Sequence, residues 1–410
     1  MSDPVRGGDQ AAATLAEAPD FDSYPVLHAI KDASPFPGGV RVLWDDGLEC
    51  RYHVFWLREN APDPQTMHPV TREQALQLLD LPDDLEAVAA GTDAAGNLVV
   101  GWSTGDESRY HPGWLYAHSH GAGGHFSLPP RKLWDAALQE DLPRFHGPTV
   151  LQDESAFTDW AEALHIHGLA ILEDLPRTPD VIEYVPARLG PLRTSNFGRV
   201  FDVRSRPDAD SNAYTDLALP LHCDLTTREY QPGLQFLHCL ENESTGGDSF
   251  LADGFHIARH LSETAPELFA ALTRIPVCFA NKARETDHRW EAPMIRLDED
   301  GECEEVRWSP WLRAPVVLSF EETALLYRAL RAAFAAAEDP HHRIKVRLRP
   351  GELLGFDNRR ILHGRSGFNT SSGARWLRGC YVEREELVSR LRIIERSKRG
   401  HDTATAGNAD

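Results

Sequence analysis

Apolar and polar positions alternate in short runs over roughly the first third of the chain. The run VRVLWDDGLECRYHVFWL alternates on both sides of Asp46-Gly47. Because that dipeptide favours a tight turn between two strands, the run predicts a hairpin. NLVVGWSTGDESRYHPGWL predicts a second hairpin after Ala94-Ala95-Gly96. We therefore expect a small β-rich domain over residues 25–128, joined to the rest of the chain by a linker rich in Gly and Pro.

Strand-like runs mix with helical periodicity from 131 to 395. Ser319-Phe-Glu-Glu322 predicts a helix start, because a Ser N-cap and a Glu at the third helical position satisfy each other's backbone N–H groups. Thr264-Ala-Pro-Glu267 predicts another, and IKVRLRP over 344–350 predicts a strand. Strands between Gly-rich turns, with helices alongside, favour a double-stranded β-helix (jelly roll). The expected fold class is mainly β with flanking helices (α+β).

Both ends of the chain have the composition of flexible segments. Residues 1–24 are rich in Ala, Gly and Asp, and residues 396–410 are similar, so we expect a disordered tail and a flexible tail. The start shows no apolar signal segment, and no run approaches the ~18 apolar residues that a membrane helix needs.

The charge balance narrows the expected partners. The 42 basic and 63 acidic residues give a net charge of -21, which repels phosphate backbones and anionic lipids. Nucleic acid and membranes are therefore not expected as partners. The 6 cysteines are scattered without close pairing, which is typical of reduced thiols and favours a cytoplasmic protein.

The first candidate for chemistry is Leu-His222-Cys-Asp224, which follows the apolar run LALPL. On a strand, residues two apart point to the same face, so His222 and Asp224 can both face a barrel interior. An imidazole and a carboxylate on one face form half of a divalent metal site. Alone, this spacing is weak, since a surface or core histidine is the more common case.

Two further residues strengthen the hypothesis. His363, in GFDNRRILHGR, completes a set of two His and one carboxylate, which leaves open metal positions and is typical of Fe(II) oxygenases that bind O₂. Arg375 follows twelve residues later and, on a strand, shares a face with Leu377, Gly379 and Tyr381. A guanidinium there can pair bidentately with a dicarboxylate such as 2-oxoglutarate. The ordered set predicts His222, Asp224 and His363 as catalytic metal ligands.

These residues lie in longer motifs that resemble one family along nearly the whole chain. The motifs are FWLRENAP…HPVTRE, NAYTDLALPLHCDL, PGLQFLHCLENESTGGDSFLADGF, GFDNRRILHGR and RWLRGCYVE…SRLRIIE. They resemble the γ-butyrobetaine hydroxylase and trimethyllysine dioxygenase branch of the taurine-dioxygenase-like superfamily. The resemblance implies a jelly-roll enzyme that uses Fe(II), 2-oxoglutarate and O₂ on a small-molecule substrate, and a homodimer.

The resemblance also assigns residues by position. His222, Asp224 and His363 correspond to iron ligands, Arg375 to the partner of the distal carboxylate of 2-oxoglutarate, and Ser249 to a co-substrate contact. The family's aromatic cage for a trimethylammonium group falls on Phe197, Phe201, Tyr214 and Tyr381. The Asn residues that anchor the substrate carboxylate are replaced by Ser211 and by Ser309 or Pro310, so Arg199, Arg313 or Asn212 are alternatives for another anion.

The family's structural zinc ligands are absent. Their positions, three Cys and one His, read Ala61, Asp63, Thr66 and Asp106 here. Structural zinc needs four soft ligands, so no structural zinc is expected, and His68 is expected to be a lone surface histidine.

The functional hypothesis is therefore an Fe(II)- and 2-oxoglutarate-dependent dioxygenase that hydroxylates a small, betaine-like acid. An alternative is an oxygenase of the same family that tailors a natural product or an aminophosphonate by hydroxylation, desaturation or cyclisation. Two others are a non-catalytic jelly-roll binding protein and a hydrolase with zinc at the same three residues.

Overall fold

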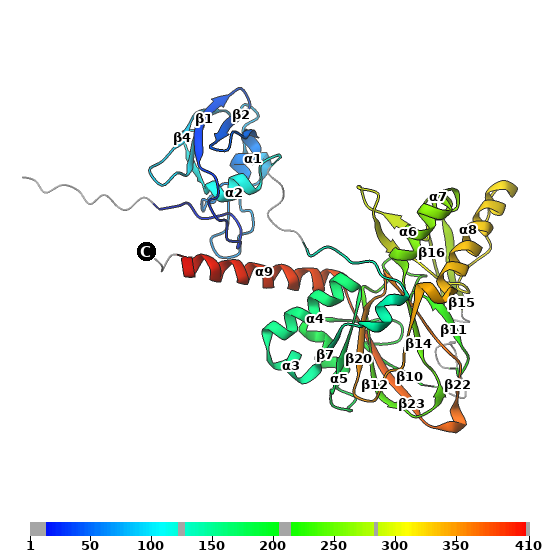
Figure 1. The fold of residues 1–410 in the computed structure, drawn as a ribbon. Helices are drawn as coiled ribbons and strands as arrows, with labels where there is room; N and C mark the ends of the chain where they lie inside the picture. Colours follow the sequence, from blue (N-terminus) through cyan, green and yellow to red (C-terminus); the bar gives the residue numbers. More distant parts are fainter. Residues whose placement is uncertain (1–13, 122–127, 205–214, 283–285, 407–410) are drawn as a thin grey trace, which may run out of the picture. The chain divides into compact units, whose positions relative to one another are not determined.

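The computed structural model describes residues 14–121, 128–204, 215–282 and 286–406 (Figure 1). The chain divides into two compact units. The first, the N-terminal unit, is Met1–Ser127 together with Ile394–Asp410. The second, the jelly-roll unit, is Leu128–Ile393.

The N-terminal unit is built from two antiparallel sheets, β1-β2-β3 and β4-β5-β6. Both predicted hairpins are confirmed: Gly47 joins β2 to β3 and Gly105 joins β5 to β6, with φ values of +92° and +90° that favour glycine. The elements are β1 (Ile30–Phe36), β2 (Gly39–Trp44), β3 (Glu49–His53), α1 (Val54–Glu59), β4 (Ala87–Thr92), β5 (Leu98–Trp102), β6 (Glu107–Tyr110) and α2 (Pro112–Ala117).

The described part of the expected N-terminal tail packs on this unit. The backbone N–H of Ala16 donates to Oδ1 of Asn97 at 2.8 Å, and Tyr24 is buried. The segment from residue 14 to residue 24 therefore differs from the disordered tail that its composition predicted, because it finds specific partners. Residues 1–13 lie outside the described part of the chain.

The expected C-terminal tail is helical as far as Ala406. α9 spans Arg384–Ala406, and Leu387, Leu391 and Ile394 on it are buried. This helical spacing of apolar residues continues the helix into a segment that we predicted to be flexible. Within the N-terminal unit, Arg396 of this helix forms an ion pair with Asp22.

The jelly-roll unit contains two sheets whose neighbouring strands come from distant parts of the chain. The larger has the order β10-β23-β12-β20-β8-β7 with β9 beside β23, and the smaller has the order β11-β21-β14-β19. This is the predicted double-stranded β-helix. The strands are β7 (Arg144–His146), β8 (Leu169–Glu173), β9 (Leu192–Arg193), β10 (Val200–Val203), β11 (Leu219–His222), β12 (Leu234–Asn242), β14 (Ser249–Asp253), β19 (Arg343–Val346), β20 (Leu353–Asp357), β21 (Ile361–Arg365) and β23 (Arg375–Val382).

Helices cover the two sheets separately. α4 packs on β8 and β20, and α5 on β12 and β23, whereas α6 contacts β14 and β21 of the smaller sheet and α7 and α8 pack beside it (Figure 1). The helices of this unit are α3 (Gly147–Gln152), α4 (Glu154–His167), α5 (Val181–Tyr184), α6 (Gly254–Thr264), α7 (Pro266–Arg274) and α8 (Phe320–Glu338). Short strand pairs complete the unit: β13 (Thr245–Gly246) with β22 (Phe368–Asn369), β15 (Val277–Lys282) with β16 (Asp287–Ala292), and β17 (Ile295–Leu297) with β18 (Cys303–Val306).

One of the two predicted helix starts is confirmed and one is displaced. Ser319 and Glu322 form the predicted capping box of α8. α7 instead begins at Pro266 without a side-chain cap, and the hydroxyl of Thr264 donates to the carbonyl of His260 at 2.7 Å at the end of α6. Proline at the first helical position needs no N–H partner, which is why this helix starts without a cap.

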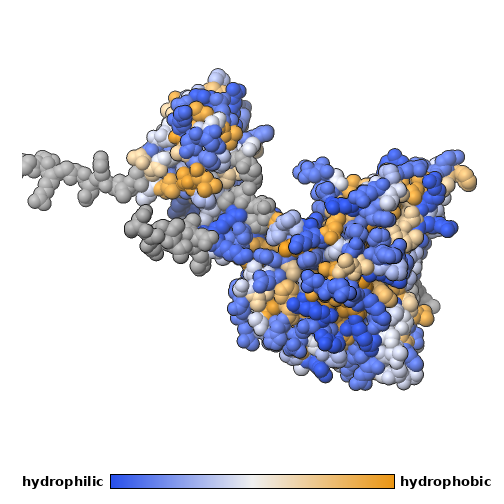
Figure 2. Space-filling view, viewed as in Figure 1, coloured by the Kyte–Doolittle hydropathy of each residue, from blue (hydrophilic) through white to orange (hydrophobic). Residues whose placement is uncertain are grey.

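Apolar residues form a buried core in the jelly-roll unit, and polar residues cover most of the visible surface. Leu169, Leu251, Phe356 and Leu377, from both sheets, belong to one buried cluster, and burial of each such side chain contributes about 2 kcal/mol. Figure 2 shows hydrophilic residues over most of the visible surface, with hydrophobic ones scattered among them. All 6 cysteines are free thiols. Within the described ranges, no helix is both long and apolar enough to cross a membrane.

Candidate active site

Strand pairing places the two candidate histidine ligands side by side. His222 ends β11 and lies directly opposite His363 in β21. Opposite residues of an antiparallel pair share a face, and the two imidazole centroids are 4.3 Å apart. The close approach of the strands requires Gly364, since a Cβ there would lie 2.7 Å from the carbonyl oxygen of Leu219.

Asp224 lies beyond the strand on which we expected it. β11 ends at His222, and the backbone around Asp224 is held by the side chain of Asn358. The Asp224 N–H donates to Oδ1 of Asn358 at 2.7 Å, and Nδ2 of Asn358 donates to the Asp224 carbonyl at 3.1 Å. The next residue, Leu225, has a φ of +54°, a conformation that a leucine rarely adopts. Fixed contacts therefore place this carboxylate where strand geometry alone does not.

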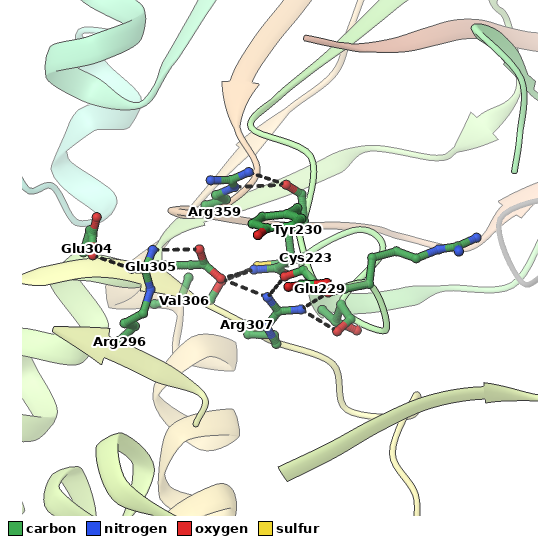
Figure 3. A network of polar contacts seen from close by, with 12 residues as sticks. Cys223, Glu229, Tyr230, Arg296, Glu304, Glu305, Val306, Arg307 and Arg359 are labelled. Atoms are coloured by element: carbon green, nitrogen blue, oxygen red, sulfur yellow. Dashed lines mark hydrogen bonds and ion pairs between the residues drawn. The ribbon is translucent and has the colours of Figure 1, made fainter. Parts of the chain in front are cut away.

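A buried arginine holds the segment that follows Asp224. Figure 3 shows Arg307 between Glu305 and the backbone of this segment. Its Nη1 donates to the carbonyl of Thr226 at 2.8 Å, and its Nη2 donates to the carbonyl of Glu229 at 3.0 Å and to Oε1 of Glu305 at 3.1 Å. The guanidinium thus satisfies backbone acceptors of a turn that has no regular secondary structure.

The three candidate ligand atoms converge. Oδ1 of Asp224 lies 3.3 Å from Nε2 of His222 and 3.6 Å from Nε2 of His363. Nδ1 of His222 lies 2.9 Å from the carbonyl oxygen of Pro220, so a proton on Nδ1 leaves the lone pair of Nε2 facing the cluster. These atoms all lie within 4.8 Å of one another, as the ligands of one metal ion do.

The protonation states suit a divalent metal. Burial alone would raise the pKa of Asp224, but the charges of His363 and His222 and their hydrogen bonds hold it well below its ordinary value. Burial, and then the neighbouring His222, lowers the pKa of His363. The donor set is one carboxylate and two imidazoles, which is the set that ferrous oxygenases use.

Aromatic rings surround the triad, and one of them, Tyr381, is also hydrogen-bonded to the candidate metal ligand Asp224. The hydroxyl of Tyr381 donates to Oδ2 of Asp224 at 2.8 Å, which leaves Oδ1 for a metal. The ring centroid of Trp311 lies 4.8 Å from that of His222, and Phe356 lies equally close to His363. Sequence reasoning had singled out Tyr381 only as a cage residue, and it had missed Trp311 and the role of Asn358.

Arg375 is a buried guanidinium with unused donors. Its Nη2 lies 3.5 Å from the carbonyl oxygen of Gly247, whereas Nε and Nη1 are buried and make no hydrogen bond. Burial, and then the charge of Arg365, lowers its pKa to about 10. Both guanidiniums lie over the ring of Phe368, at 5.3 Å for Arg375 and 4.8 Å for Arg365. A buried charge of this kind is costly without an anion, so the arrangement fits a bound carboxylate.

The segment that lies against Arg375 continues into β14, the neighbour of the strand that carries His363. A Cβ on Gly247 would lie 2.8 Å from Nε of Arg375, so glycine allows the close approach. Two residues on, Ser249 is buried and lies opposite Arg365 in the β14–β21 pair, in which Leu251 lies opposite His363. Ser249, Arg365 and His363 therefore share one face of the smaller sheet.

Three of the residues predicted to form an aromatic cage lie next to one another, and one of them, Tyr381, contacts Asp224. The ring of Phe201 lies 5.1 Å from that of Tyr381 and 5.9 Å from that of Phe197. Gly379 lies opposite Phe201 and makes room for its ring, since a Cβ there would lie 2.5 Å from the Phe201 ring. The predicted contacts Tyr214, Ser211 and Asn212 lie outside the described residues.

The other candidates for anchoring a substrate anion are engaged elsewhere or exposed. The hydroxyl of Ser309 accepts the backbone N–H of Leu312 at 3.0 Å. Arg313 donates to the carbonyl of Pro310 and lies over the ring of Phe334 in α8. Arg199 is exposed on the loop before β10. The described residues thus show the three candidate metal ligands and the buried Arg375 and, of the predicted cage, Phe197, Phe201 and Tyr381.

Residues 128–381 match the model of the family described as taurine catabolism dioxygenase TauD, TfdA family. The chain belongs to this family. It is 42% identical over 381 residues to gamma-butyrobetaine dioxygenase of Pseudomonas sp. (strain AK-1), with 92% of this chain and 99% of the relative covered. It is 30% identical over 387 residues to trimethyllysine dioxygenase of Meyerozyma guilliermondii, with 90% and 96% covered.

Among solved structures, asparagine oxygenase in complex with Fe(II), 2S,3S-3-hydroxyasparagine and succinate superposes with a TM-score of 0.46 and 19% identity, covering 56% of this chain and 80% of that chain. This TauD-family chain is thus a dioxygenase that uses Fe(II), 2-oxoglutarate and O₂ on a small-molecule substrate. The convergent His222, Asp224 and His363 and the unused donors of Arg375 fit these two groups. Family membership does not support a binding protein without activity, nor a zinc hydrolase.

Proposed function

We propose that this TauD-family enzyme hydroxylates a small acid that carries a trimethylammonium group. The observation that carries the proposal is the position of Tyr381, whose hydroxyl is hydrogen-bonded to Asp224 and whose ring packs against Phe201. A wall of aromatic rings therefore begins at a metal ligand. Such rings attract a quaternary ammonium group through cation–π interactions, which need no hydrogen-bond donor on the cation.

The relatives support the same substrate class. The substrates named for the two relatives above, gamma-butyrobetaine and trimethyllysine, both carry a trimethylammonium group. Two of the three described rings are phenylalanines, and Phe faces bind a cation more weakly than Trp faces. We therefore expect weaker selection for the cation than a cage of Tyr and Trp would give.

In this proposal His222, Asp224 and His363 hold the ferrous ion, and Asn358 and Tyr381 position the carboxylate among them. Arg375 pairs with the distal carboxylate of 2-oxoglutarate, and Ser249, on the face of the smaller sheet that carries His363, is a second polar contact. Bound iron and 2-oxoglutarate together supply the activation of O₂, with release of succinate and CO₂. The chain contributes alignment of the substrate against Phe201 and Tyr381 and, through Trp311 and Phe356, exclusion of water from the imidazoles.

The proposal is tested by a screen for substrate-stimulated succinate formation. Betaine-type acids should stimulate succinate formation, whereas aminophosphonates and amino acids without the quaternary group should not. Stimulation by an aminophosphonate alone would contradict the substrate class but leave the iron chemistry intact.

Two variants separate the metal site from the cage. Asp224→Ala should abolish succinate formation, whereas Asp159→Ala, an exposed carboxylate on α4, should leave it unchanged. Phe201→Leu should raise the KM for a betaine by about tenfold, in line with a cation–π contribution of 1–2 kcal/mol. The exposed Phe320→Leu serves as its matched control.

We also propose that the enzyme is a homodimer in the cytoplasm. The family resemblance supports the dimer, and the unpaired cysteines support a reducing compartment. Light scattering of the purified protein tests the first point, and cell fractionation tests the second. A monomer in solution would contradict the dimer without affecting the assignment of the active site.

A further inference from the structure

Three histidines outside the triad meet beside the smaller sheet. His256 and His260 belong to α6, and His342 ends the 3₁₀ helix η5 (Pro340–His342), just before β19. Nε2 of His256 lies 3.2 Å from Nδ1 of His342. The ring of His342 is 5.2 Å from that of His256 and 4.7 Å from that of His260. All three side chains are half-buried.

The local structures of α6 and η5 explain why the three histidines lie close together. His256 and His260 are four residues apart on a helix, so their side chains are neighbours on one face. The same helix buries Ile257 and Leu261 on its other side. The carboxylate of Asp339 accepts the N–H of His341 at 2.9 Å and caps η5, which fixes the turn that carries His342. The cluster thus joins segments about eighty residues apart in the sequence.

The spacing of the nitrogens matches that of ligands on one ion. Two nitrogens bound to zinc at about 2.0–2.1 Å in tetrahedral geometry lie roughly 3.3 Å apart. We propose that His256, His260 and His342 form a second metal site, which binds a divalent transition metal such as Zn²⁺. The pair His256–His342 already has the required separation, at 3.2 Å.

His260 completes the site by turning its ring. In the described part of the chain, the groups whose ligand atoms already lie within 4.8 Å of one another are the triad and His28, Asp45 and Asp46. The imidazole of His260 therefore has to rotate toward the other two, and its centroid distance of 4.7 Å from His342 makes that a side-chain movement. Water can fill the remaining positions.

The chemistry of the cluster distinguishes it from the iron site. Three imidazoles without a carboxylate favour zinc, copper or nickel, whereas a carboxylate in the set favours harder ions. Burial lowers the pKa of His342, and the neighbouring His260 and His256 lower it further, so this ring offers a lone pair at neutral pH. A bound ion would tie α6 to the start of β19, the neighbour of β14 in the smaller sheet.

The test is Zn²⁺ binding to the enzyme already loaded with Fe(II) and 2-oxoglutarate, without oxygen and without a histidine tag. Dialysis against Zn²⁺ followed by metal analysis should give one zinc per chain, while the visible band of the iron–2-oxoglutarate chelate persists. His256→Ala and His342→Ala should each weaken zinc binding by at least about 100-fold, since loss of an outer hydrogen-bond partner alone weakens metal affinity about 10- to 100-fold.

The neighbouring His341→Ala is the matched control, because its side chain is 91% exposed and its Nδ1 lies 2.8 Å from Oδ1 of Asp339. It should bind zinc as the unchanged protein does. The chelate band in each variant shows that the jelly roll is folded and that iron is in place. As a second readout, Cu²⁺ in place of zinc should show coupling to imidazole nitrogens in its electron paramagnetic resonance spectrum.

Several outcomes would overturn the proposal. One is the absence of a bound zinc in the loaded enzyme, and another is unchanged zinc binding in His256→Ala and His342→Ala. Loss of zinc in His28→Ala instead would place the ion in the N-terminal unit, and loss of the chelate band on adding zinc would place it at the triad. None of these results bears on the proposed substrate, because the experiment measures metal binding in the absence of substrate and oxygen.

Discussion

The triad of the jelly-roll unit and the residues Arg58, Asp63 and Thr66 of the N-terminal unit make an informative pair. In the branch that the sequence resembles, a metal is expected at both places, but this chain keeps only the ligands of the triad and lacks those of the structural zinc. In the triad, the Nε2 atoms of His222 and His363 lie 3.3 Å and 3.6 Å from Oδ1 of Asp224. In the N-terminal unit, the buried Arg58 donates to the hydroxyl of Thr66 and lies 3.5 Å from Oδ2 of Asp63.

The difference lies in the balance of donors and acceptors. The triad brings together the ligand atoms of two imidazoles and a carboxylate, and a bound cation satisfies their lone pairs together. The N-terminal cluster supplies its own cation, and the hydroxyl of Thr66 also donates to Oδ1 of Asp63 at 2.9 Å. A polar cluster that satisfies itself contributes to folding, whereas one left with matching lone pairs is open to a ligand.

The strongest test of this contrast removes a buried charge that forms no ion pair among the described residues. Arg375→Met should raise the KM for 2-oxoglutarate on the order of 100- to 1,000-fold, because loss of one member of a buried charge pair costs about 2–5 kcal/mol. Titration of the chelate band measures the affinity directly. Arg378→Met, on the other face of the same strand, is the control. An Arg375→Met enzyme with normal affinity would show that the co-substrate lies elsewhere.

The sequence predicted which residues belong to the candidate site better than it predicted the contacts that position them. His222, His363 and Arg375 lie on strands, as the sequence around each of them predicted. Asp224 does not follow that rule, because β11 ends before it. Its position depends on Asn358, more than a hundred residues away, and no local pattern shows such a contact. The neighbouring Asn-Arg-Arg in GFDNRRILHGR was the available signal.

Other parts could not be predicted because they depend on tertiary partners. The helical continuation of α9 depends on buried Leu391 and Ile394, whose partners the sequence does not reveal. Likewise, the absence of the family's cysteines is visible in the sequence, but the Arg58 network in their place is not. The jelly roll itself was predictable, because alternating strands and Gly-rich turns are local properties.

A second prediction concerns acid stability. Burial lowers the pKa of His165 and of His238 to about 4 each, with Arg131 as a further cause for His165. Both are neutral when folded, and in the unfolded chain they take up protons near pH 6.5. Stability is therefore complete above about pH 6.5 and is lost as the pH falls toward 4, by about 2 kcal/mol each at pH 5.

Hydrogen exchange at pH 7 and pH 5 resolves where that loss occurs. Since α4 and β12 carry these histidines, the jelly-roll unit should lose protection first. His238→Gln should reduce the difference in unfolding free energy between the two pH values. Equal loss of protection in both units, or an unchanged pH dependence in the variant, would contradict the assignment.

The third prediction tests how Asp224 is placed. Asn358→Ala removes both hydrogen bonds to the backbone of Asp224 and should weaken Fe(II) binding about 10- to 100-fold, as loss of outer-shell partners does. The affinity for 2-oxoglutarate at saturating iron should change little. Asn60→Ala, in the N-terminal unit, is a control that should leave iron binding unchanged. A variant with normal iron affinity would mean that β11 and the ligands themselves suffice.

The fourth prediction concerns Tyr381, which serves both the metal ligand and the aromatic wall. Tyr381→Phe keeps the ring but removes the donor to Oδ2 of Asp224, at a cost of about 1 kcal/mol. We expect several-fold weaker iron binding, a shifted chelate band and little change in substrate KM. If the substrate KM rises while the band stays unchanged, Tyr381 acts on the substrate only.

The smallest effect is expected in the N-terminal cluster, and it completes the contrast. Thr66→Val removes a hydroxyl that links Arg58 to Asp63, but these two residues keep their ion pair, so the unit should lose only about 1–2 kcal/mol of stability. Turnover and iron affinity should not change, and the exposed Thr71→Val should alter neither property. A large fall in activity in Thr66→Val would show that the N-terminal cluster supports the iron site after all. The self-satisfied cluster would then be part of the catalytic machinery, rather than a structural substitute for a metal.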